Sequence, residues 1–200
     1  MASSEVAISN MALARIGVTT FISSLSERSQ EANVCSLFYE PCRDFVLSDD
    51  YDWNFASKRT QLSNLGSPPT NWQYRYALPS DCLKARNIVI AGMPTPRSDQ
   101  RIPFEVSVEN EAKVLYTDQP LAELLYTRRV TDPNLFSPSF IMAFAWYLGS
   151  EIAFPLSVSQ SIATKAFQMY AQVIARAGAS SMNESQKRVE PESEFISGRN

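Results

Sequence analysis

The sequence predicts an α+β protein in which both ends of the chain build a helical bundle and a central antiparallel β-sheet or barrel is inserted between them. Apolar residues recur at helical spacing before residue 50 and after residue 133. Between residues 53 and 131 the chain instead carries seven of its twelve prolines and a series of short apolar runs, as strands and turns require. The predicted boundaries are 1–50 and 133–185 for the bundle, 51–132 for the β insertion and 186–200 for an extended, flexible C-terminal arm.

The first two helices are predicted at 4–16, which ends at Gly17, and at 27–48. In the second segment, apolar residues recur every three to four positions, as on one face of a helix. Pro41 interrupts this pattern, because it cannot donate a hydrogen bond to the carbonyl of Leu37. We therefore expect a kink there, or two shorter helices.

Six short runs in the middle of the chain are predicted to be strands of a small antiparallel sheet or barrel. In one of them, Phe104, Val106 and Val108 alternate with polar residues, which predicts that these three side chains face a core. Turn-forming residues separate the runs. The six runs are 53–62, 72–78, 85–92, 102–109, 112–117 and 123–130.

Helical spacing returns near the C-terminal end, with one helix predicted at 139–153 and another beginning after Ser157. Pro155 separates the two. Between Pro133 and Thr164 the only charged residue is Glu151, so this helix pair must be buried on several sides. Either the core of the bundle or a subunit interface could bury it.

The amino-acid composition excludes several classes of function. The chain contains no histidine, so a Ser-His-Asp triad, a Cys-His dyad and a zinc site with histidine ligands are all excluded. Its glycines form no phosphate-binding loop, and a net charge of −3 without a Lys/Arg cluster is unlike a protein that reads a nucleic-acid groove. We therefore expect no cofactor, no metal ion and no enzymatic activity.

We also expect a soluble protein that makes no contact with a membrane. The N-terminus has neither the basic region nor the long apolar core of a signal peptide. The longest apolar stretch, 140–149, is about half of the roughly 20 residues that cross a bilayer.

The three cysteines are interpreted as reduced, partly buried thiols. Cys35 and Cys42 are seven residues apart in a predicted helix, which separates them by about 10.5 Å along its axis and exceeds the reach of a disulfide. Cys82 lies in the predicted β insertion.

Asp49, Asp50 and Asp52 form a small acidic cluster that could bind Ca²⁺ or supply catalytic carboxylates. The cluster lacks the spacing and the glycine of a calcium-binding loop, and we interpret it as a turn that ends a helix. The alternative function is a peptidoglycan hydrolase that uses paired carboxylates, although no particular pair stands out. A small regulatory domain with an aromatic pocket is a third possibility, and no motif favours it.

Five segments occur in a distinctive order along most of the chain. They are ALARIG at 12–17, DYDWNFASKRTQL at 50–62, YALPSDCLKARNI at 76–88, the stretch 124–157 that runs from LLYTRRV to FPLS, and the ending EFISGRN. Together they resemble the head-to-tail adaptor family of short-tailed bacteriophages, also called tail tubular protein A.

The resemblance implies a structural protein of the virion tail, made in the host cytoplasm and located at the head–tail interface. Members of that family form a dodecameric ring beneath the portal protein and join the head to the tail nozzle protein. DNA passes through the central channel of the ring without sequence-specific binding. By this resemblance, the helical bundle and the C-terminal arm face the portal, and the β insertion points toward the nozzle.

Three groups of residues are candidates for these contacts. Phe144 and Trp146 point to different sides of one predicted helix, so we expect one of them to serve the core and the other a neighbouring subunit. The candidates are Phe195, Ile196 and Arg199 for the portal, Phe144, Trp146 and Tyr147 for the subunit interface, and Trp72, Tyr74 and Tyr76 for the face toward the nozzle.

Overall fold

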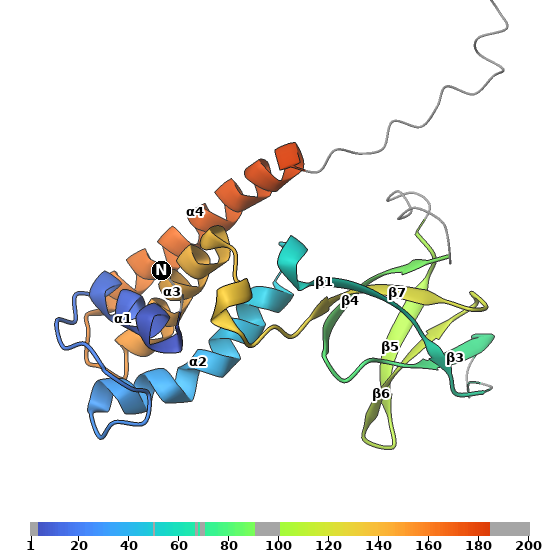
Figure 1. Cartoon of the computed structure of the whole chain (residues 1–200), viewed down its shortest axis with the longest axis horizontal. Coiled ribbons are helices and arrows are strands. Elements are labelled where there is room, and N and C mark those ends of the chain that lie inside the picture. The colour runs from blue at the N-terminus through green and yellow to red at the C-terminus, as the bar shows by residue number, and fades with distance from the viewer. Residues whose placement is uncertain (1–3, 50, 67, 69–70, 91–100, 185–200) are drawn as a thin grey trace, which may run out of the picture.

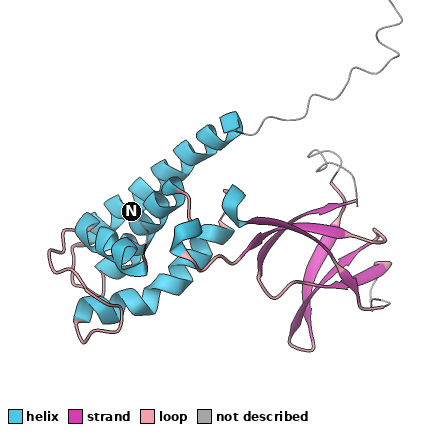
Figure 2. Ribbon diagram, viewed as in Figure 1, coloured by secondary structure: helices cyan, strands magenta, loops and turns pink. Residues whose placement is uncertain are grey.

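A computed structural model describes residues 4–49, 51–66, 68, 71–90 and 101–184 (Figure 1). Over these residues the chain is an α+β protein with four α-helices and two antiparallel sheets. The helices form one body and the strands form a separate lobe beside it (Figure 2). The two sheets stay open, so the expectation of a closed barrel is wrong.

Serine residues set the start of three helices. The hydroxyls of Ser4, Ser29 and Ser137 each accept a hydrogen bond from the backbone N–H three residues further on, at 3.1 to 3.3 Å. Each bond satisfies one of the N–H groups that the first turn of a helix leaves free. The helices are α1 (Glu5–Arg15), α2 (Gln30–Ser48), α3 (Pro138–Ala153) and α4 (Gln160–Glu184), with short 3₁₀ turns η1 (Asn54–Ala56) and η3 (Pro133–Leu135).

Helix α2 continues through Pro41 as one element, so the expectation of two shorter helices is wrong. Pro41 and Leu37 both lie on the exposed side of the helix. The carbonyl that loses its hydrogen bond to Pro41 therefore faces water, which can replace the missing donor.

Helix α3 is the centre of the helical body. It packs against all three other helices, with α4 along one side and α1 and α2 along the other (Figure 1). Phe140, Phe144, Leu148 and Ile152 on α3 are fully buried. The ring of Tyr39 from α2 meets Phe144 edge-on, with 5.0 Å between the ring centroids, a favourable geometry for two aromatic rings.

All strands of the described chain lie between Ser57 and Arg128. One sheet has the order β1-β7-β4 and the other β2-β3-β6-β5, and the pairs within each are antiparallel. A small core of its own, including Leu115, Leu124 and Tyr126, holds the lobe together. The strands are β1 (Ser57–Gln61), β2 (Ser63–Asn64), β3 (Tyr74–Ala77), β4 (Cys82–Val89), β5 (Phe104–Glu109), β6 (Ala112–Thr117) and β7 (Glu123–Arg128).

The register of strand β5 agrees with the predicted face, because Phe104 packs against the core of the lobe and Val106 lies opposite buried Leu115. The two valines are nevertheless not buried. Val106 and Val108 are 45% and 66% exposed, whereas Glu109 is partly buried. The Glu109 carboxylate pairs with Arg75 at 2.8 Å and accepts a hydrogen bond from the Tyr116 hydroxyl, so this face of the strand turns toward the sheet's polar contacts. Because β5 is an edge strand, its two valines lie exposed at the border of the lobe.

Candidate functional site

The acidic cluster at the end of α2 has structural partners. Asp49 caps the C-terminus of α2 and accepts a hydrogen bond from the Tyr170 hydroxyl, and Asp52 pairs with Arg86 at 2.9 Å. Asp50 lies outside the described residues. Across the part of the chain that the structure describes, no group of three His, Cys, Asp or Glu side chains is arranged to hold a metal ion.

Cys35, Cys42 and Cys82 are unpaired and buried, as predicted. Burial raises the pKa of the Cys35 and Cys82 thiols to about 11 and that of Cys42 to about 12. Since the thiolate is the reactive form of cysteine, these three side chains are poor nucleophiles at neutral pH.

None of the described helices combines the length and the apolar character that crossing a membrane requires.

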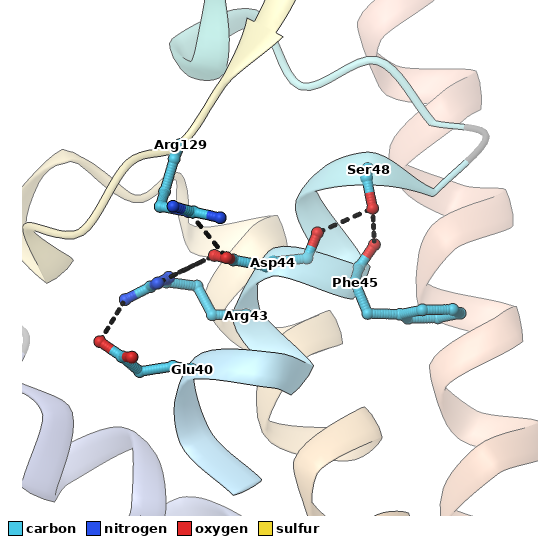
Figure 3. A network of polar contacts seen from close by, with 6 residues as sticks. All are labelled: Glu40, Arg43, Asp44, Phe45, Ser48 and Arg129. Atoms are coloured by element: carbon cyan, nitrogen blue, oxygen red, sulfur yellow. Dashed lines mark hydrogen bonds and ion pairs between the residues drawn. The ribbon is translucent and has the colours of Figure 1, made fainter. Parts of the chain in front are cut away.

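A network of charged groups joins the helical body to the chain that returns from the β lobe (Figure 3). Arg43 of α2 is only 2% exposed, and its guanidinium pairs with Asp44 at 2.9 Å and with Glu40 at 3.7 Å. Asp44 also accepts a hydrogen bond of 2.7 Å from Arg129, just beyond β7. One carboxylate thus links a helix to the segment that leaves the sheet, and the Ser48 hydroxyl extends the network by donating to the Asp44 carbonyl.

Two further contacts fix the sheet of β1, β7 and β4 against the end of α2. The Lys84 ammonium donates to the Asp49 carbonyl at 3.1 Å, and Arg86 bonds both Asp52 and the Thr127 hydroxyl. Trp53 then anchors the connection, since it is buried and its indole N–H donates to the Val46 carbonyl at 2.9 Å. These contacts join the two lobes firmly.

Large apolar side chains are exposed on both sides of the helical body. On the α1–α2 side, Leu37 is 69% exposed at the edge of an open groove of about 560 Å³. On the α4 side, Phe167 is 51% exposed and Ile162 is also exposed. Phe154, between α3 and α4, is 88% exposed. Exposed apolar residues mark a surface that another protein covers where they lie together in one patch.

The three candidate interface residues of α3 occupy different environments. Phe144 is fully buried, which leaves it no surface for a second copy and makes it the core member of the pair with Trp146. Trp146 is partly buried beneath the Arg15 guanidinium, which lies 4.5 Å from its ring centroid. Tyr147 is partly buried between helices and stacks on Phe45 at 4.6 Å.

The candidates for the face toward the nozzle lie in the β lobe. Tyr76 is buried and donates its hydroxyl to the Gln119 carbonyl at 2.9 Å, so it is a core residue of that lobe. Trp72 and Tyr74 are partly exposed, and the Trp72 indole donates to Glu105 at 3.0 Å. Val106 and Val108 are exposed to a larger fraction than these aromatic residues.

Phe195, Ile196 and Arg199, the candidates for portal binding, lie outside the described residues, as does the whole predicted arm 186–200.

The exposed residues Leu37 and Phe167 were not singled out by the sequence reasoning. The available signal was their position beside the apolar stripe of each helix: Phe167 directly follows buried Ala166, and Leu37 precedes Phe38, which packs on the core. An apolar residue that falls off the buried stripe indicates a second apolar face.

In comparisons with known proteins, no family model and no curated protein matches this chain. The resemblance to the adaptor family therefore depends on the five sequence segments alone.

Proposed function

We propose that this protein is a structural subunit of a bacteriophage virion, a head-to-tail adaptor that forms a ring between the portal and the tail nozzle. The observation that carries the proposal is the presence of exposed apolar side chains on two opposite sides of a helical body that is firmly joined to a β lobe. The ordered sequence segments that resemble the adaptor family support the same function.

A closed ring of identical subunits requires two different contact faces on each subunit, because every copy meets its two neighbours through unlike surfaces. The α4 side and the α1–α2 side of the helical body supply such a pair, with Phe167 on one and Leu37 on the other. A dodecamer is the stoichiometry that the family resemblance suggests.

We assign the contact with the nozzle to the β lobe. Strand β5 is the outermost strand of its sheet among the described residues and exposes Val106 and Val108, so another protein could add to it or cover it. Trp72 and Tyr74 contribute further partly exposed aromatic surface in the same lobe.

The charge of the chain is compatible with a channel through which DNA moves. A strongly basic channel would bind phosphates through counterion release and would slow the passage of DNA. A net charge of −3 avoids this, and several arginines of the described chain pair with carboxylates, among them Arg43 and Arg75.

A deletion of residues 190–200 tests the contact with the portal. We expect the truncated chain to keep its melting temperature and to lose binding to portal rings in co-sedimentation, because Phe195 and Ile196 are the apolar anchors of this segment. A double Phe195→Ser and Ile196→Ser variant is the matched control that keeps the length of the chain. Undiminished binding by both variants would refute this assignment.

A further inference from the structure

We propose that helix α4 of one copy docks in the groove between α1 and α2 of the next copy, and that this contact builds the ring. The inference rests on the proposed ring and goes further, since it names the two surfaces and the residues that pair across them. Three observations carry it: a groove with an unpartnered hydroxyl, a helix face of opposite charge, and the position of the two surfaces on opposite sides of α3.

The groove lies between the start of α1, the loop before α2 and the middle of α2. Glu5 and Glu40 give it negative charge, while Leu37 and Leu25 give it apolar surface. Tyr39 also lines the groove, and it is 99% buried. Its hydroxyl has no hydrogen-bond partner among the described residues. A buried hydroxyl without a partner lowers stability, so an acceptor brought by a ligand would be favourable there. Because the hydroxyl oxygen is itself enclosed, such an acceptor reaches it only when side chains at the edge of the groove move aside.

The outer face of α4 has the complementary properties. Lys165 and Arg176 are exposed, and neither forms an ion pair with another residue in the described ranges. From Ile152 to Asn183 the sequence contains these two cations and no carboxylate. Phe167, whose apolar ring suits Leu37, lies on the opposite flank of the exposed half of α4. Exposed Gln168, whose amide oxygen can accept a hydrogen bond from the Tyr39 hydroxyl, lies between the two flanks.

The arrangement of the helices favours a second copy of this chain as the occupant. Because α4 and the α1–α2 groove lie on opposite sides of α3, one copy can present its α4 to one neighbour and its groove to the other at the same time (Figure 1). A contact of this head-to-tail kind propagates from copy to copy and closes into a ring when the rotation permits. Opposite charges on the two surfaces also disfavour pairing of two like surfaces.

A charge exchange between two variants tests the contact by mass photometry. The first variant, Lys165→Glu with Arg176→Glu, has two acidic surfaces, and the second, Glu5→Lys with Glu40→Lys, has two basic ones. We expect each variant alone to need at least about tenfold higher concentration to assemble than the wild-type chain. We expect a 1:1 mixture to assemble again, because alternating copies restore opposite charges at every contact.

Controls separate this contact from the proposed function. Arg101→Glu with Lys113→Glu makes the same change in net charge on exposed residues of the β lobe, and it should assemble as the wild-type chain does. If either charge-reversed pair assembles normally, or if the mixture fails to assemble although both variants are folded by circular dichroism, the contact is wrong and a ring built through other surfaces is still possible.

A wild-type chain that is monomeric up to about 1 mM also overturns the contact. Portal binding would then test the adaptor role separately.

The variant Tyr39→Phe gives a second measurement that does not depend on charge. Because this variant lacks the unpartnered hydroxyl, its melting temperature should be unchanged or higher than that of the wild-type chain. Its assembly should nevertheless be several-fold weaker. Assembly equal to that of the wild-type chain would show that the hydroxyl meets no acceptor in the ring.

Discussion

At the scale of single residues, the junction of the two lobes depends on the ion pairs of one buried arginine. Arg43 has almost no exposed surface, and an unpaired charge in that position would cost several kcal/mol. Asp44 neutralises it at 2.9 Å and also binds Arg129 (Figure 3). The sequence contains this Arg-Asp pair beside Pro41 and gives no indication that the arginine is buried, because its burial depends on α3 and on the return from β7.

Replacing Asp44 by alanine should therefore destabilise the protein strongly. We expect the free energy of unfolding, measured by urea denaturation, to fall by about 3 kcal/mol, because Arg43 keeps its charge but loses its nearest partner. The variant Arg129→Ala removes the exposed partner of the same carboxylate and should cost no more than about 1 kcal/mol. Equal losses in the two variants would contradict this difference between a buried and an exposed ion pair.

At the scale of elements, local signals predicted the helices well and the extent of burial of strand residues less well. The predictions at 4–16 and 139–153 agree within one residue at each end with α1 and α3, because a serine cap and the apolar spacing are local properties. The alternation in 102–109 predicted a strand and its core face, but not that Val106 and Val108 stay 45% and 66% exposed on that face. How deeply the residues of an edge strand are buried depends on segments far away in the sequence.

Helices α1 and α3 pack closely at Gly149. A Cβ atom placed there would lie 3.3 Å from the Ala12 carbonyl oxygen and 3.3 Å from the Ile16 side chain. We expect Gly149→Leu to lower the free energy of unfolding by about 2 kcal/mol, since it forces the two helices apart. Gly178→Ala is the matched control in α4, where a Cβ meets Tyr51 only at 3.9 Å, and stability should change by less than about 1 kcal/mol. If the Gly149→Leu protein were as stable as the control, α1 and α3 could move apart at this position without a loss of stability.

The loop between α1 and α2 should make stability depend on acid pH through Glu27. Hydrogen bonds from the hydroxyl and N–H of Ser23, together with one from the Ser29 hydroxyl, lower the pKa of Glu27 to about 2. The carboxylate is thus bound more tightly to these donors when folded than when unfolded, where its pKa is about 4.3. The contribution of Glu27 to the free energy of unfolding is therefore present above pH 4.3 and is lost as the pH falls toward 2.

We expect Glu27→Gln to remove this part of the pH dependence. Melting temperatures of the wild-type chain and the variant should differ most above pH 5 and should converge as the pH approaches 2. A constant difference across that range would mean that Glu27 titrates no differently in the folded and unfolded chain.

At the scale of the whole molecule, the sequence predicted an α+β chain with its strands in the middle, and the structure adds how the two lobes are joined. The join uses Lys84, Arg86 and Arg129, whose contacts with Asp49, Asp52 and Asp44 span 34 to 85 residues of sequence and so leave no local pattern. The candidate surfaces were predictable only in part. Phe144 and Trp146 looked equivalent in the sequence, and tertiary packing alone decides which one is buried.

The assembly state of the purified wild-type chain is the most direct test of the proposal that this protein forms an adaptor ring on the portal. Mass photometry across a concentration series, repeated with portal rings added, measures whether the chain forms a closed ring. A ring-forming adaptor should give a species near twelve times the 22.4 kDa mass of one chain, about 269 kDa, alone or as a step in mass on the portal. A 22.4 kDa monomer at every concentration, with no change in mass of the portal rings, would contradict the proposal.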